Sequence, residues 1–245
     1  MGGPPAEDGR ALTTETQLVV SEGQTDEERI FVEPRWPIAL ALSAYIVISI
    51  TLRIAEPTRE SLGPHWLIPS IEIALLGALI AADPARLHRR SRWLRRVSIA
   101  LIFALAAATL LATAVLIVDL IRGGRVTESA SSLLASGALI WLGNALVFGL
   151  LYWALDSGGP LARYRRDRAY PDFAFSQQLS PELAPPGWRP QYVDYAILGL
   201  TTSTAFSPTD VMPMSAWAKL TMSLQSLISL SVIGLVIARA VNVFS

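Results

Sequence analysis

The sequence contains no cysteine, and only 16% of its 245 residues are charged. The absence of cysteine excludes a disulfide scaffold, a thiol nucleophile and cysteine-based metal sites. The two histidines, His65 and His88, are far from any acidic cluster, so we expect no metal site and no cofactor. Soluble domains carry about 25% charged residues. This chain therefore has too little charge to cover a water-facing surface, which indicates an integral membrane protein.

Short enzyme motifs are also missing. The sequence has no GxSxG, HExxH, Walker or GxGxxG pattern, and these are the patterns that place a nucleophile, a zinc ion or a nucleotide phosphate. We therefore predict that the protein is not an enzyme. Its basic residues flank hydrophobic runs and form no separate basic patch, so no nucleic-acid partner is expected.

Long hydrophobic runs decide the fold class. A helix needs about 20 residues to cross about 30 Å of hydrocarbon, and continuous apolar runs without alternation favour helices over barrel strands. The sequence therefore predicts an all-α, polytopic transmembrane helical bundle with the lipid bilayer as its surroundings. Five long membrane helices are expected, over residues 36–52, 66–82, 97–118, 129–155 and 220–238.

A sixth run, residues 195–209, is uncharged but only 15 residues long. As a helix it would measure roughly 22 Å, which suits a half-helix that re-enters the membrane or a short sixth span. The charge rule mildly favours the crossing, because Arg239 would then lie at the cytoplasmic end of the last helix. Ser207 and Pro208 resemble a helix start with Asp210 in the first turn, so a break is predicted near residue 206.

Four regions follow from these patterns. Residues 1–33 hold eight acidic and two basic residues, a net charge of −6, and are predicted to be a disordered acidic tail. Residues 34–156 form the four-helix transmembrane region, and residues 157–190 form a polar connection rich in glycine, proline and arginine. Residues 191–243 hold the short polar run, a turn and the final helix.

Arginine placement predicts the orientation. Cytoplasmic loops of membrane proteins carry an excess of basic residues, so the loop between the second and third runs is expected in the cytoplasm. This places the N-terminus and residues 157–190 there too, in a multi-pass protein of the inner (plasma) membrane. The same side chains are candidates for binding anionic lipid headgroups. They are Arg86, Arg89, Arg90, Arg92, Arg95 and Arg96.

A few polar residues fall inside apolar runs. Glu72 is the intramembrane acid, and it either handles a proton or cation or lies near the outer interface. Thr201, Thr202 and Thr204 either line an ion path or pack helices through small polar side chains. Gln225 belongs to a polar stripe of the final helix with Thr221 and Ser229. That stripe must face other helices, a second copy or water.

The order of these features resembles a known family. The residues are Ala82-Asp83-Pro84-Ala85-Arg86 followed by clustered arginines, Gly158-Gly159, Tyr192-Val193-Asp194-Tyr195, a Thr-rich turn ending in Asp210-Val211, and Ala240-Val241-Asn242. This order is similar to the bacterial membrane family catalogued as domain of unknown function 1345. The resemblance covers roughly residues 36–243 and implies a multi-helix inner-membrane protein without an assigned activity.

The C-terminal part also resembles the pore region of tetrameric cation channels. Tyr195 to Thr202, the turn to Asp210 and the long apolar helix after Pro213 follow the order of pore helix, filter and inner helix. Residues 203–208 contain no glycine, so a potassium-type ladder of carbonyls is not expected. The side chains of Thr201, Thr202, Thr204 and Asp210 are then the candidate ion contacts.

From these features we expect channel-like permeation through a homo-oligomeric pore, with monovalent cations as the candidate ions. One polar stripe and one short polar segment cannot enclose a pore, but several copies around an axis can. Two alternatives stay open. The protein is a non-conducting membrane scaffold or assembly protein, or it transports a small solute, for which inverted repeats would be expected.

Overall fold

The computed structural model describes residues 36–55, 74, 92–122, 130–204 and 210–244, all within the unit Pro34–Ser245. These residues are mostly helical, as the all-α prediction requires. The long helices are α2 (Trp36–Ala55), α4 (Arg92–Arg122), α5 (Ala130–Leu155) and α9 (Ala216–Phe244), and α8 (Tyr192–Ser203) is short. The acidic tail lies outside the described residues, and so does the run 66–82 apart from residue 74.

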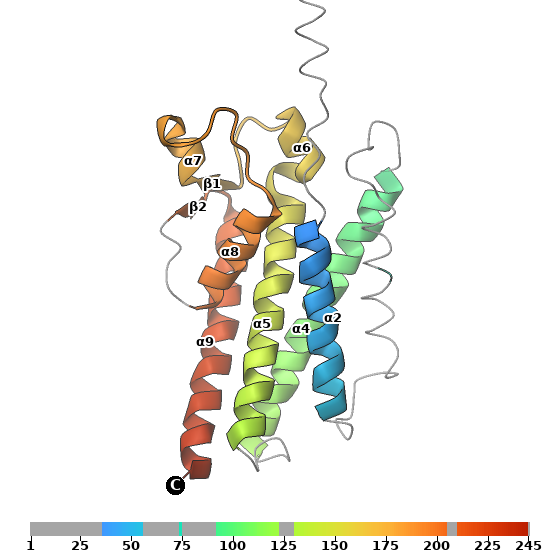
Figure 1. The fold of residues 1–245 in the computed structure, drawn as a ribbon, viewed down its shortest axis with the longest axis vertical. Coiled ribbons are helices and arrows are strands. Elements are labelled where there is room, and N and C mark those ends of the chain that lie inside the picture. The colour runs from blue at the N-terminus through green and yellow to red at the C-terminus, as the bar shows by residue number, and fades with distance from the viewer. Residues whose placement is uncertain (1–35, 56–73, 75–91, 123–129, 205–209, 245) are drawn as a thin grey trace, which may run out of the picture. The chain divides into compact units, whose positions relative to one another are not determined.

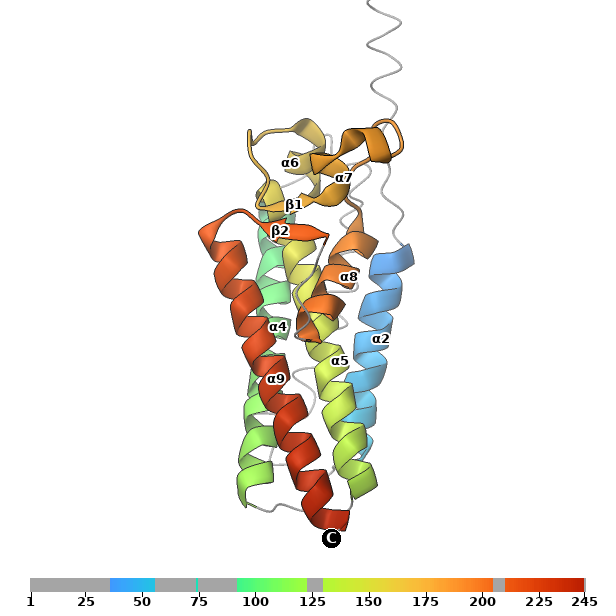
Figure 2. The ribbon, with the colours of Figure 1, turned by 90° about the vertical axis from the view of Figure 1, so that its left-hand side faces the viewer.

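Helix α5 is the centre of the bundle. It packs against α2, α4, α8 and α9 (Figures 1 and 2). A large apolar cluster joins α2, α4, α5, α8 and the start of α9, and a smaller one joins α4, α5 and α9 around Leu116, Leu133 and Val236. The fully buried side chains of these clusters explain why helices without strong amphipathic patterning assemble in one arrangement.

Three of these helices contain stretches long and apolar enough to cross a membrane. The stretches are Ile99–Val118 in α4, Ser131–Arg165 beginning in α5, and Ala216–Asn242 in α9, while α2 contains the shorter apolar stretch Trp36–Leu52. The chain is thus a membrane protein with three candidate spans among the described residues. The predicted total of five long membrane helices stays a prediction.

A small cap covers the end of the bundle where α5 ends, which we call the connection end (Figure 1). Its strands are β1 (Phe173–Phe175) and β2 (Val211–Pro213), which pair antiparallel with Ala174 opposite Met212. The other cap elements are short helices: η3 (Asp156–Gly158), α6 (Pro160–Arg165), α7 (Ser176–Leu179) and η4 (Pro181–Leu183). The polar connection is therefore folded, and it buries Phe173 and Phe175 among the aromatic rings around α5 and α8.

The strand pair decides between the two predictions for the sixth run. Helix α8 begins at the connection end, where the Tyr195 ring lies 5.2 Å from that of Phe175. The chain returns to that end, because Asp210 accepts a hydrogen bond from Ser176 and β2 pairs with β1. The crossing that we favoured from charge is therefore wrong, because α8 begins at the same end of the bundle as β2 (Figure 2).

The predicted helix start at Ser207 and Asp210 is also wrong. Asp210 precedes β2, and α9 begins only at Ala216. The physical reason is that pairing with β1 gives the backbone of Val211–Pro213 its hydrogen-bond partners. These residues therefore form a strand and not the first turn of a helix. A pattern of Ser, Pro and Asp favours a helix start locally but cannot report a distant strand.

Candidate functional site

The half-helix α8 begins with a capping box. Asp194, the third helical residue, accepts a hydrogen bond through Oδ2 from the N–H of Gln191 at 2.7 Å. Burial raises the pKa of the Asp194 carboxyl above its ordinary 3.8, backbone N–H groups at Gln191 and Asp194 act against this rise, and the negative charge of Asp210 adds to it. The two carboxylates therefore interact at the connection end.

Close packing holds α8 against α5. A Cβ added to Gly199 would lie 2.5 Å from the carbonyl oxygen of Ala145 and 2.9 Å from the backbone nitrogen of Gly149. One added to Gly149 would lie 3.1 Å from the carbonyl oxygen of Tyr195. Two glycines thus allow the backbones to touch, as in other membrane helix pairs that use small residues at the contact.

The far end of α8 lies halfway along α5. Trp141, near the middle of α5, donates through Nε1 to the carbonyl of Ser203 at 2.9 Å. The last residues of α8 are buried there, with Ser203 0% exposed, so neighbouring groups must satisfy the last carbonyls of the helix. The Ser226 hydroxyl donates to the Thr202 carbonyl at 3.2 Å, and the Thr204 hydroxyl donates to the Thr201 carbonyl at 2.7 Å.

Gln225 of α9 completes the hydrogen bonding at this end of α8. Its Nε2 donates to the Gly199 carbonyl and to the Ser203 hydroxyl, both at 2.7 Å, and its Oε1 accepts from the Tyr152 hydroxyl at 2.6 Å. The side chain is 0% exposed, so all its hydrogen bonds are made within one chain. Gln225, a candidate pore residue, thus faces other helices of its own chain and joins α5, α8 and α9.

Its neighbours on the polar stripe also point inward or bond to their own helix. Ser229 accepts a hydrogen bond from Asn144 of α5 at 3.0 Å, and the Thr221 hydroxyl donates to the Trp217 carbonyl at 2.8 Å. Of the three partners that the sequence left open for the stripe, the structure thus selects neighbouring helices for Gln225 and Ser229. Polar groups in a low-dielectric interior need such partners.

The remaining candidates for an ion path divide into two groups. Thr202 is buried, and its hydroxyl has no hydrogen-bond partner within the described part of the chain. Thr201 and Thr204 are half-buried, and the Thr201 hydroxyl donates to the Ile197 carbonyl at 2.9 Å. Asp210 is exposed at the connection end. Thr201, Thr204 and Asp210 are thus the three candidates that reach the surface of one chain.

Other predicted residues are only partly described. Glu72, Arg86, Arg89 and Arg90 lie outside the described residues, and so do His65 and His88. Arg92, Arg95 and Arg96 begin helix α4, and Arg96 is exposed. No cluster of three or more possible metal ligands occurs in the described ranges.

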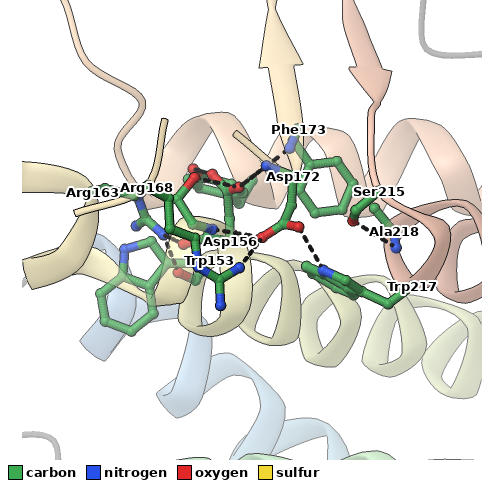
Figure 3. A network of polar contacts seen from close by, with 11 residues as sticks. Trp153, Asp156, Arg163, Arg168, Asp172, Phe173, Ser215, Trp217 and Ala218 are labelled. Atoms are coloured by element: carbon green, nitrogen blue, oxygen red, sulfur yellow. Dashed lines mark hydrogen bonds and ion pairs between the residues drawn. The ribbon is translucent and has the colours of Figure 1, made fainter. Parts of the chain in front are cut away.

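Two buried aspartates, Asp156 and Asp172, connect α8 and α9 to the end of α5 (Figure 3). Asp156 is 1% exposed and accepts from the backbone N–H groups of Asp172 and Phe173 and, at 2.5 Å, from the Tyr195 hydroxyl of α8. Asp172 accepts from the Trp217 indole at 2.8 Å and pairs with Arg168 at 3.3 Å. These contacts connect the ends of three helices.

An arginine caps α5 within the same network. Arg163 donates through one nitrogen to the carbonyls of Trp153 and Asp156, at 2.6 and 3.0 Å, and its guanidinium lies 4.8 Å from the centre of the Tyr195 ring. A cation at a helix C-terminus is favoured by the helix dipole. Sequence reasoning missed this network, although Asp156 at the end of a long uncharged run was a visible signal.

Comparisons with known proteins add no relative. Searches against protein-family models, curated proteins and solved structures each found no match.

Proposed function

We propose that the protein forms a channel-like path for monovalent cations in the bacterial inner membrane, built by several copies around the re-entrant half-helix α8. The observation that carries this proposal is that α8 enters from the connection end and the chain returns there before α9 begins. Irregular backbone at membrane depth is tolerated only where protein covers it or where it lines a water-filled cavity. A pore loop followed by a long helix meets that condition.

One chain does not enclose such a path. The outward face of α8 carries Val193, Ile197 and Leu200, which are exposed in the single chain. Further copies around an axis would cover this face and bring several Thr201 and Thr204 hydroxyls together. Hydroxyl and carboxylate oxygens are ligands for hard cations.

Two carboxylates near α8 support cations as the permeant ions. Asp210 is exposed at the connection end, and its negative charge interacts with the Asp194 carboxyl. Carboxylates at the mouth of a low-dielectric pore raise the local concentration of cations. The absence of glycine from residues 203–208 argues for contacts through side chains in place of a carbonyl ladder.

The distribution of basic residues supports a cytoplasmic connection end, with re-entry from the cytoplasm. Arg92, Arg95 and Arg96 begin α4 at that end, and the connection adds five arginines (Figure 1). At the opposite end, the described helices α2, α4 and α9 contribute Arg53, Arg122 and Arg239. Excess arginine marks the cytoplasmic side.

A non-conducting scaffold is the second candidate function. It is favoured by Gln225 and Ser229, whose polar atoms hold α5, α8 and α9 together within one chain. In that case α8 only packs between other helices of the bundle, and the folded cap at the connection end would be the partner-binding surface.

Ion flux into liposomes tests the proposal. We expect Thr201→Val to reduce cation flux, because it removes a half-exposed hydroxyl from the path. Thr51→Val is the matched control, since the Thr51 hydroxyl donates to the Val47 carbonyl at 2.8 Å in the same way on α2. Equal flux for the two variants would contradict the assignment of Thr201.

Asp210→Asn tests the mouth. It should lower cation flux several-fold at low ionic strength and much less at high ionic strength, where salt screens the charge. Glu182→Gln, an exposed carboxylate in η4, is the control. Absence of flux from correctly folded wild-type oligomers would exclude the channel and leave the scaffold.

A further inference from the structure

The arginines of the connection are not equivalent. Arg163 is used in capping α5, and Arg189 donates to the Tyr164 carbonyl at 2.9 Å while lying 4.7 Å from the centre of that ring. Arg168 is paired with Asp172. These three guanidinium groups therefore stabilise the cap itself.

Arg165 and Arg166 are exposed, and neither side chain has a hydrogen bond or ion pair to any described residue. Arg165 is the last residue of α6, which belongs to the cap and follows the end of the apolar helix α5 at Leu155. Two guanidinium groups without a partner among the described residues therefore lie on the cap, beyond the end of α5.

The backbone holds this pair of arginines in a fixed turn. Arg166 has a φ of 54°, in the left-handed region, and its N–H bonds to the carbonyls of Ala162 and Arg163. A non-glycine residue is uncommon in that conformation. The two side chains are therefore presented from a closed helix end and not from a freely moving loop.

We propose that Arg165 and Arg166 bind the phosphate of an anionic phospholipid at the connection end. Guanidinium groups match phosphate oxygens in bidentate geometry and are weakly hydrated, which suits a site at the headgroup layer. Tyr170, 85% exposed a few residues further on, is of the residue type enriched at that layer. We commit to a lipid phosphate over free phosphate because α6 lies in the cap at one end of a bundle of candidate membrane helices, where lipid headgroups would be within reach (Figure 1).

Charge attraction alone does not account for this site. Asp167 is exposed directly after the two arginines, so it offsets one of the two positive charges. Selectivity for anionic lipid is then expected to depend on the placed guanidinium groups more than on net charge. This inference does not depend on ion conduction.

Thermal unfolding of the purified full-length protein in mixed micelles tests the site. We expect phosphatidylglycerol, but neither phosphatidylcholine nor inorganic phosphate, to raise the unfolding temperature of the wild type. The double variant Arg165→Gln/Arg166→Gln should need at least about tenfold more phosphatidylglycerol for the same rise. Its unfolding temperature in phosphatidylcholine should match that of the wild type, because neither side chain supports the fold.

The control lowers the net charge of the same end by the same two units at another exposed position, as Lys219→Glu. It should keep the wild-type response. Native mass spectrometry should also find fewer retained phosphatidylglycerol molecules on the Arg165/Arg166 variant than on this control. An unchanged response in the Arg165/Arg166 variant, an equal loss in the control, or an equal effect of inorganic phosphate would overturn the proposal.

Discussion

Replacement of Gln225 by methionine tests whether this side chain caps α8 or lines a pore. Methionine has similar length and fills the space, but it cannot form the hydrogen bonds to Tyr152, Gly199 and Ser203. Hydrogen bonds between membrane helices contribute about 0.6 kcal/mol on average and up to about 1.7 kcal/mol. Three lost bonds therefore remove about 2 kcal/mol, and a buried tyrosine hydroxyl left without its Gln225 acceptor adds about 1 kcal/mol or more.

We therefore expect Gln225→Met to lower the free energy of unfolding by about 2–4 kcal/mol. Reversible unfolding in mixed micelles, followed by circular dichroism, measures this quantity. Ser223→Ala, an exposed position on the same helix, is the control and should change it by less than about 0.5 kcal/mol.

A double-mutant cycle with Tyr152→Phe isolates the hydrogen bond between the two side chains. The cost of Tyr152→Phe should be about 1 kcal/mol smaller in the Gln225→Met background than in the wild type. Equal unfolding free energies for Gln225→Met and Ser223→Ala would refute the reasoning, because a residue that lines a water-filled path loses no buried hydrogen bond when it is replaced.

Two further predictions concern the same half-helix. Gly199→Ala places a methyl group 2.5 Å from the Ala145 carbonyl oxygen and should lower the free energy of unfolding by about 1–3 kcal/mol. The control is Gly234→Ala, which should be neutral or slightly stabilising because an added methyl group would have nothing within 4 Å. Equal unfolding free energies for the two variants would contradict the close contact. Because burial raises the pKa of Asp194 above 3.8, the folded protein binds more protons than the unfolded chain just above pH 3.8, and stability should fall as the pH rises through the raised pKa. Unfolding measured from acidic to neutral pH should show this slope in the wild type and a smaller slope in Asp194→Asn, and identical slopes would show that another group titrates.

The long helices were determined by local sequence. The predicted runs 97–118, 129–155 and 220–238 fall on α4, α5 and α9, with only residue 129 outside the described helices. Lipid offers the backbone no hydrogen bonds, so an apolar run of sufficient length must be helical whatever its neighbours are. Composition indicated a membrane protein because only 16% of the residues are charged, too few to cover a water-facing surface.

The placement of the polar residues was decided by the tertiary structure. Gln225 has a polar side chain in an apolar helix, and the sequence around it does not show whether it lines a pore or bonds to neighbouring helices. Its partners Tyr152 and Gly199 are 73 and 26 residues away along the chain. The return of α8 likewise depends on the pairing of β1 with β2. Such hydrogen bonds form only when distant segments meet, so the sequence limits which residues need a partner, and the fold determines which partner they find.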